Sequence, residues 1–286
     1  MLNLRNTTLC ALAAILMVAA GCTNRGPWTD PAIVRFTSSA RDYDVKATDV
    51  TLSDGDEVGI FAGEPFAVGN VRGVVSGKSI FPEREMYWED GQQSATRFSA
   101  YCPYVPDVPG EIFPFSVSED QRLYAGYAAS DLRTASVAVS PCNVVNFVFE
   151  HRMSKLILDI EPGGRVISDV AVGEVFRDGT MDMATGEVSD LSGSGYVHAG
   201  LAAVSAEARA YVAVFMPETV RLELLITADG KKYLYTLEEP QEFLSGCAYY
   251  ASILLDDGDV MNIPVGFSVT VTDWESGEPL EFMPEP

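Results

Sequence analysis

Alternation of apolar and polar residues with a period of two dominates this chain, and it predicts short β-strands. Between residues 220 and 226 every second residue is apolar, and the alternation resumes from Tyr233 to Leu237. Asp229-Gly230 stands between these runs, and this dipeptide favours the tight turn of a β-hairpin. We find no convincing helical periodicity in the sequence. The pattern therefore predicts a nearly all-β fold.

Turn-forming residues separate many short alternating runs along the rest of the chain. Such spacing is typical of antiparallel β-sandwiches, because parallel sheets would need crossover helices between their strands. Further strands are expected at Val58–Ile60, Phe113–Val117, Val137–Val139 and Val265–Val271. The sequence thus favours tandem β-sandwiches over an α/β fold.

The first 21 residues have the layout of a signal peptide. Arg5 precedes an apolar stretch from Leu9 to Ala20, which is too short to span a bilayer as a helix. Small residues up to Gly21 then lead directly to Cys22, as cleavage by a lipoprotein signal peptidase requires. We therefore expect cleavage between Gly21 and Cys22, and a lipid on Cys22 that holds the chain on a membrane. The alternative is an ordinary secretory signal, because Ala19 stands where leucine is commonest.

Removal of the signal peptide leaves 286 − 21 = 265 residues, which is enough for two domains that each bury a core. Residues 22–32 are polar and contain two prolines, so they predict a lipidated tether. The change of composition at Ser140-Pro141 predicts a domain boundary. We expect an N-terminal β-sandwich over residues 33–140 and a C-terminal β-sandwich over residues 141–286.

Charge and composition exclude several classes of partner and cofactor. The chain has 19 basic and 41 acidic residues and a net charge of −22, which argues against nucleic acid as a partner. The mature chain keeps Cys102, Cys142 and Cys247 at wide spacing, and its histidines are His151 and His198. No ligand spacing typical of zinc is present, so we expect no metal site and interpret the cysteines as small apolar residues.

The sequence also lacks the motifs that carry common enzyme chemistry. Neither a GxSxG, a GxGxxG, a Walker nor an HExxH pattern occurs, so we expect no catalytic residue and no cofactor. The acidic segments Ser53–Glu57 and Asp256–Asp259 could bind calcium, but neither has EF-hand spacing. A charged surface turn is the simpler interpretation of both.

Aromatic residues gather at Tyr87-Trp88 and at Tyr101 and Tyr104. Flat aromatic faces could stack on a sugar ring, which would make the protein a surface lipoprotein that binds glycan or peptide. The other interpretation places alternate members of each group in a sandwich core, where aromatic residues are common. We favour the core interpretation and keep the binding function as the alternative.

The order of several segments along the chain carries a family resemblance. After the lipidation motif come an IVRF strand and the segments LSDGDEVGIFA, FSAYCPY, NFVFEHRMSKLILDIE and VTVTDWESG. Together they resemble the Bacteroidales fimbrillins, the Mfa-like type V pilin family, over essentially the whole mature chain. The resemblance implies two tandem transthyretin-like β-sandwich domains in an outer-membrane lipoprotein. It also implies a structural protein of fimbriae whose partners are other pilin subunits, with a host or bacterial surface ligand as a further partner to test.

The same resemblance implies how the subunits join. A protease cuts after a basic residue and releases the first strand, and a strand from the next subunit fills the groove. Here the candidate exchanged strand carries Ile33, Val34 and Phe36, and the candidate processing site is Lys46-Ala47 with Arg41 nearby. The family usually has arginine where this chain has Lys46. An uncut subunit would serve as an anchor or accessory component, with Lys46 an exposed charge in a loop.

Overall fold

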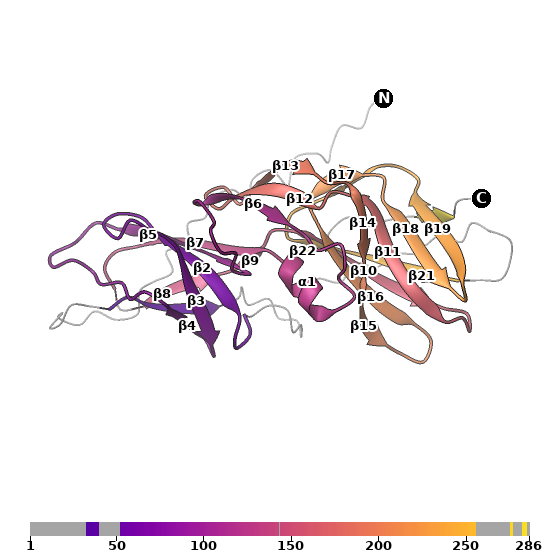
Figure 1. Cartoon of the computed structure of the whole chain (residues 1–286), viewed down its shortest axis with the longest axis horizontal. Coiled ribbons are helices and arrows are strands. Elements are labelled where there is room, and N and C mark those ends of the chain that lie inside the picture. The colour runs from indigo at the N-terminus through magenta and orange to yellow at the C-terminus, as the bar shows by residue number, and fades with distance from the viewer. Residues whose placement is uncertain (1–32, 40–51, 143, 256–274, 277–281, 285–286) are drawn as a thin grey trace, which may run out of the picture.

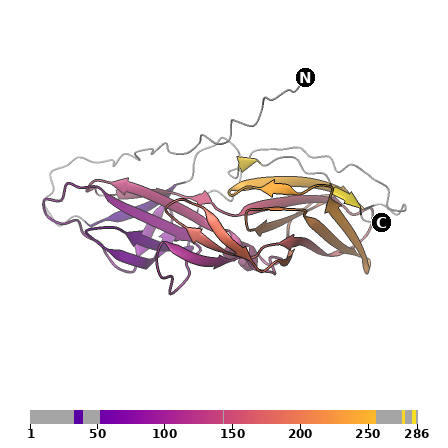
Figure 2. The same cartoon turned by 90° about the horizontal axis from the view of Figure 1, so that it is seen from above.

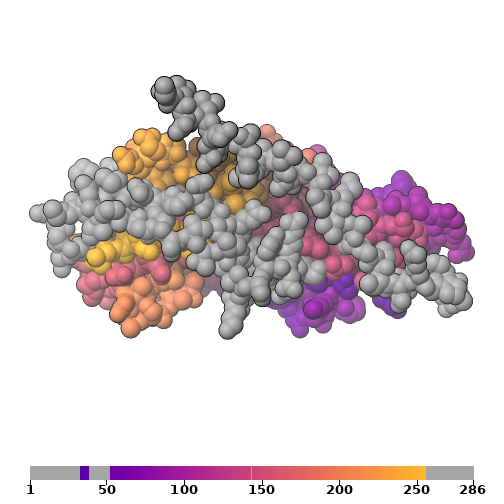
Figure 3. Space-filling view, turned by 180° about the vertical axis from the view of Figure 1, so that it is seen from behind, coloured from indigo at the N-terminus to yellow at the C-terminus, as the bar shows by residue number. Residues whose placement is uncertain are grey.

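The computed structural model describes residues 33–39, 52–142, 144–255, 275–276 and 282–284. Strands make up most of these residues, and α1 (Tyr124–Ser130) is the one α-helix among them. The molecule is elongated, with two β-rich lobes end to end (Figures 1 and 2). Seen from behind, the indigo and the yellow parts of the chain again lie at opposite ends (Figure 3). The prediction of a nearly all-β fold is confirmed. Within the described ranges, no helix has the length and apolar character needed to cross a bilayer.

The N-terminal lobe is built on a sheet with the spatial order β8-β1-β4-β3-β2-β5-β7-β9. Alternate residues of its strands face inward, as in β2, where Val58 and Ile60 are fully buried. Phe149 alone joins β8 to β9, so the two ends of the sheet come close together and the sheet curls around its core. The strands are β1 Arg35–Ser39, β2 Glu57–Ala62, β3 Val68–Ser76, β4 Ser79–Pro82, β5 Thr96–Cys102, β7 Arg133–Val139, β8 Val144–Val148 and β9 Glu150–His151.

Strand pairing crosses the boundary that the sequence predicts at residues 140 and 141. β8 and β9 follow this position, yet they pair with β1 and β7, which precede it. In the opposite direction, β6 (Ile112–Ser116) precedes the boundary and pairs with β12 (Asp178–Asp182). The division into residues 33–140 and 141–286 stays a prediction, and the sheets themselves share segments across it.

The C-terminal lobe is a sandwich of two sheets, with the orders β15-β16-β10-β21-β22 and β14-β11-β18-β19-β23 among the described residues. Apolar side chains from both sheets form one buried core, which includes Leu156 and Leu224. Ala199 alone joins β14 to β15, so the chain crosses there from one sheet to the other. The strands are β10 Ser154–Glu161, β11 Ile167–Val175, β14 Gly195–His198, β15 Gly200–Val204, β16 Arg209–Phe215, β18 Glu223–Ala228, β19 Lys231–Leu237, β21 Cys247–Leu254, β22 Glu275–Ser276 and β23 Phe282–Pro284.

The predicted hairpin at Asp229-Gly230 is confirmed. β18 and β19 pair antiparallel, with Ala228 opposite Lys231 at the turn. Asp229 and Gly230 both have positive φ, 48° and 75°, which is the backbone conformation that a tight two-residue hairpin turn needs. Leu224 and Ile226 are fully buried on the inner face of β18, as the alternation predicts.

A third apolar cluster lies between the lobes and joins them. It combines Phe61 and Tyr101, from the N-terminal sheet, with Met181 of β12 and with Val214 and Ala248 of the C-terminal sandwich. β13 (Val188–Ser192) pairs with β12, and β17 (Glu218–Val220) pairs with β20 (Gln241–Phe243). Figure 1 shows β6, β12 and α1 in this middle region. Because the cluster is buried, separating the lobes would expose apolar surface to water.

A buried ionic group lies at the end of the N-terminal sheet, beside this cluster. Asp131 follows α1 and is 4 % exposed, and its Oδ1 lies 2.6 Å from Nδ1 of His151 in β9. Its Oδ2 lies 3.6 Å from Nε of Arg133 in β7. Burial alone would raise the pKa of Asp131, but the nearby charges and the hydrogen bond with His151 outweigh burial and lower that pKa. The ionised carboxylate is therefore part of the folded state.

We expect Asp131→Asn to lower the free energy of unfolding by about 3–5 kcal/mol, because Arg133 would lose its buried carboxylate partner. In the wild type, this stabilisation is present above the unfolded pKa of about 3.9 and is lost as pH falls through the lower folded pKa. The variant should therefore be less sensitive to acid than the wild type. Urea titrations at several pH values measure both effects, and Asp159→Asn, an exposed change on β10, is the control.

Candidate strand-exchange site

The candidate site is the position of β1, which lies inside the N-terminal sheet. β1 pairs antiparallel with β4, with Phe36 opposite Ile80, and parallel with β8, with Phe36 opposite Val145. The first strand of the chain is thus inserted between two strands that come much later in the sequence. Its removal would leave the facing edges of β4 and β8 without a partner.

Alternate residues of this segment enter the lobe's core. Val34 and Phe36 are 2 % and 1 % exposed, whereas Arg35 between them is exposed. The ring of Phe36 stacks on Phe147 of β8, with centroids 5.6 Å apart, and meets the edge of Phe98 of β5 at the same centroid distance. Both geometries are favourable for aromatic pairs. The strand therefore supplies a central part of the apolar core as well as sheet pairing.

Polar contacts fix the register of β1. The amide of Val34 donates to the carbonyl of Met86 at 2.8 Å, and the amide of Ser38 donates to the carbonyl of Lys78 at 2.9 Å. The hydroxyl of Thr37 donates to Oδ1 of Asn146 on β8 at 3.0 Å. A strand shifted by one residue would move Phe36 out of the core, so one register is strongly preferred.

The structure places part of the predicted site and leaves part outside the described residues. Val34 and Phe36 are buried at this position, and Ile33 forms an isolated bridge with Tyr87 just before β1. Gly21, Cys22, Arg41, Lys46 and Ala47 lie outside the described residues. Strand exchange, lipidation of Cys22 and cleavage after Arg41 or Lys46 therefore stay predictions.

The connection between β1 and the rest of the lobe has one covalent route, through residues 40–56. Both candidate cleavage positions, after Arg41 and after Lys46, fall on that route. A cut at either position would leave β1 attached to the lobe by noncovalent contacts alone. This geometry connects the predicted processing site with the predicted exchanged strand.

The aromatic residues considered for ligand binding belong mainly to the core. Trp88 is 5 % exposed, and its indole N–H donates to the carbonyl of Cys142 at 2.7 Å. Tyr101 is fully buried in the junction cluster, whereas Tyr87 is 46 % exposed. Trp88 and Tyr101 are therefore core residues, as the core interpretation predicts.

The structure also shows where the three cysteines and the two histidines considered as metal ligands lie. Cys102, Cys142 and Cys247 are buried, and burial raises the pKa of the Cys102 thiol to about 12. His151 lies in the ionic group at the junction, and His198 lies 2.9 Å from Asp169. Within the described part of the chain, no group of three or more His, Cys, Asp or Glu side chains is arranged to hold a metal ion.

Sequence reasoning missed both neighbours of β1. The partner positions Thr37 and Asn146 are 109 residues apart, and alternation identifies strands without saying which strands pair. The short, largely apolar run VVNFV of β8 is a usable signal for a buried strand. Nothing local in that segment shows that β8 runs parallel to the first strand.

These features define a class, that of β-sandwich proteins whose first strand is inserted into a sheet formed by later segments. A profile of the family described as "Fimbrillin-like" matches residues 46–274, most of the chain. The protein therefore belongs to the fimbrillin-like family, a family of fimbrial structural proteins and not an enzyme class. No curated protein sequence matches the chain significantly.

Solved structures support the fold. A candidate cell adhesion protein from Bacteroides uniformis has a TM-score of 0.62 at 20% sequence identity, covering 79% of this chain and 94% of its own. A candidate cell adhesion protein from Bacteroides ovatus has a TM-score of 0.63 at 15% identity, covering 90% of this chain and 96% of its own. At these identities the likeness concerns the fold alone.

We expect Phe36→Ala to lower the free energy of unfolding by about 3–5 kcal/mol, because it removes a fully buried ring and leaves a cavity. Arg35→Ala in the same strand should change it by less than about 0.5 kcal/mol, because Arg35 is exposed. Chemical denaturation of both variants measures the difference. Equal effects of the two substitutions would contradict the assignment of β1 as a core strand.

Proposed function

We propose that this protein is a fimbrial subunit, or an accessory component of a fimbria, that assembles by β-strand donation. It is exported as an outer-membrane lipoprotein with a lipid on Cys22, and it has no catalytic role. The observation that carries the proposal is the position of β1 between β4 and β8, with Phe36 in the core and one covalent connection to the rest of the lobe. Membership of the fimbrillin-like family supports the fimbrial context.

Cleavage in residues 40–51 would change how firmly β1 is held. In the intact chain β1 is tethered next to its groove, and such a tether corresponds to an effective concentration of about millimolar. After a cut at Arg41 or Lys46, β1 dilutes away when it dissociates, and a strand from another subunit can take its place. The fimbrillin-like match begins at residue 46, which is consistent with a mature part that starts near the cut.

The groove specifies what an incoming strand must look like. A strand in the orientation of β1 runs parallel to β8 and antiparallel to β4, and it satisfies both edges. It must also place apolar side chains at the positions of Val34 and Phe36, which are the buried positions of β1. A charged residue at the position of Phe36 would be desolvated without a partner, so it would prevent binding.

The fate of the lipid follows from the same cut. Cys22 precedes β1, so cleavage after Arg41 or Lys46 separates the lipid from the body of the subunit. A cut subunit loses its membrane anchor as it gains an open groove, whereas an uncut subunit stays on the membrane with its groove filled. The uncut form is suited to an anchor or accessory role.

A reversible covalent lock on β1 tests the proposal. Thr37 and Asn146 face each other on β1 and β8, so Thr37→Cys with Asn146→Cys places two thiols at neighbouring positions. We expect the oxidised double variant to be produced and folded but not to enter fimbriae, and reduction to restore assembly. Electron microscopy and the sedimentation of cell-surface material measure assembly.

Two controls make the outcome decisive. Thr37→Cys alone should assemble in oxidising and reducing conditions alike, and the mass of the recovered protein reports the N-terminus. A new N-terminus at Asp42 or Ala47 identifies a processed subunit, and a lipidated Cys22 identifies a tethered one. Normal assembly of the oxidised double variant would show that β1 does not leave its groove.

A further inference from the structure

One polar side chain interrupts the strand that lies beside β1. β8 consists of Val144, Val145, Asn146, Phe147 and Val148, so Asn146 is its one polar residue. Val145 and Phe147 face the core, whereas Asn146 lies on the opposite, half-buried face of the strand. Asparagine is depleted in β-strands, and valine would suit this position better. Strand preference therefore does not explain Asn146, and its contacts do.

Asn146 contacts the outward face of β1. Thr37 lies opposite Asn146 in the parallel pairing of the two strands, and its hydroxyl donates to Oδ1 of Asn146 at 3.0 Å. On its other side, Thr37 lies opposite Ser79 of β4. Thr37 is half-buried, whereas its neighbours Phe36 and Ser38 are buried on the inward face. Three short polar residues thus form one row across the groove, and the middle one belongs to β1.

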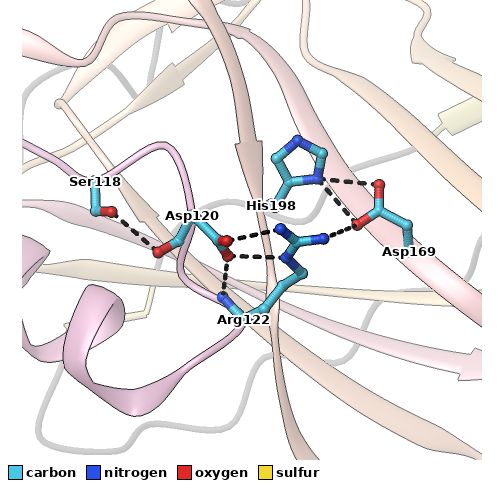
Figure 4. A network of polar contacts seen from close by, with 5 residues as sticks. All are labelled: Ser118, Asp120, Arg122, Asp169 and His198. Carbon is cyan, nitrogen blue, oxygen red and sulfur yellow. Dashed lines mark hydrogen bonds and ion pairs between the residues drawn. The ribbon is translucent and has the colours of Figure 1, made fainter.

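A larger polar network of the molecule lies away from the groove (Figure 4). The guanidinium of Arg122 donates to both carboxylate oxygens of Asp120 at 2.9 and 2.7 Å, and it lies 3.8 Å from Asp169 of β11. His198 of β14 lies 2.9 Å from the same Asp169. All four residues lie in the C-terminal lobe or in the loop before α1, so removal of β1 would break none of these contacts. The bond between Thr37 and Asn146 differs because one of its partners belongs to β1.

The inward and outward faces of β1 meet different requirements. The inward face must fill apolar space, as Phe36 does by stacking on Phe147 with a centroid distance of 5.6 Å. Any strand with the right alternation and the right volume would satisfy that requirement, whatever side chains it carried outward. Asn146 adds a requirement on the outward face, because its Oδ1 accepts hydrogen bonds and does not donate them.

Hydrogen-bond chemistry limits which side chains satisfy Asn146 from the position of Thr37. The hydroxyls of serine and threonine are short donors, and the distance of 3.0 Å shows that such a donor reaches Oδ1 from the opposite strand. An aliphatic side chain of the same size would take this donor away from a half-buried acceptor, which weakens binding. Lysine and arginine are donors, but their long side chains carry the charge past Asn146 into solvent. The position therefore favours a short hydroxyl residue.

We propose that Asn146 is a specificity-determining residue of the groove and selects incoming strands that carry serine or threonine at the position of Thr37. This inference rests on the proposed strand donation and adds the outward face of the partner strand to its requirements. The partner strand then carries a large apolar residue at the position of Phe36, followed directly by a hydroxyl residue. Because the two requirements fall on adjacent positions, they specify one register of the partner strand.

Peptide exchange in the cut protein tests the proposal. In the full-length chain, a recognition sequence for a site-specific protease in place of residues 42–47 allows β1 to be cut from the lobe after folding. A fluorescent peptide with residues 31–39 then competes with the cut β1, and its anisotropy measures entry into the groove. We expect an unlabelled peptide with Thr37→Ser to compete within about twofold of the wild-type peptide, and one with Thr37→Val to compete about tenfold less well. Arg35→Ala, an exposed change in the same peptide, should leave competition unchanged.

Substitutions in the groove show whether Asn146 causes this preference. Asn146→Val removes the acceptor and suits a β-strand, so the variant should bind the wild-type and the Thr37→Val peptides equally. Asn146→Asp retains an acceptor at Oδ1 and should retain the preference for a hydroxyl. Arg122→Ala weakens the polar network of the C-terminal lobe, away from the groove, and should also retain the preference. Unaltered circular dichroism of the three variants shows that the fold is intact.

The outcomes separate this inference from the proposal on which it rests. Equal competition by the wild-type and the Thr37→Val peptides in the wild-type protein would overturn the inference and leave strand donation standing. A preference that persists in Asn146→Val would overturn it as well. If the wild-type peptide does not enter the cut protein, strand donation and the inference fail together. A peptide with Phe36→Glu, which places a charge in the core, should not compete and controls for binding outside the groove.

Discussion

The requirement that every strand inside a sheet have partners on both sides governs this structure. β8 and β4 are separated in sequence by about half of the N-terminal lobe, and β1 connects them by pairing with both. Phe36 of β1 packs between the aromatic rings of Phe98 and Phe147, so the same strand completes the ladder and the core. Unpaired backbone groups and exposed aromatic surface would both appear if the position were empty.

This arrangement gives the first strand two properties that rarely occur together. It is deeply buried, which makes the occupied groove stable, and it has a single covalent connection, which makes its occupant replaceable. A strand at the edge of the sheet could leave without disturbing the core. A strand in the middle of the chain could not be separated by one cut. The proposed role in strand donation rests on this combination, and the fimbrillin-like family supplies the setting in which it is useful.

The remainder of the molecule packs against the end of the sheet that contains β1. The apolar cluster between the lobes ties the end of the N-terminal sheet to the C-terminal sandwich. The buried group of Asp131, Arg133 and His151 holds the segment after α1 against β7 and β9 at the same end of that sheet. Since β9 contains His151 and directly follows β8, this junction also holds the strand that lies beside β1. The C-terminal lobe is therefore packed against the end of the sheet that holds β1.

The sequence by itself determined the strand-rich character, the hairpin at Asp229-Gly230 and the family. These are consequences of local alternation, of backbone conformations that few residues adopt, and of the order of segments. It also predicted a domain boundary at residue 140, across which the described sheets share strands, and it carried no signal for the short helix α1 at residues 124–130. Seven residues form too short a segment for helical periodicity to emerge. The tertiary structure alone decided that β1 lies between β4 and β8, because pairing between segments 109 residues apart depends on the packing of the whole lobe.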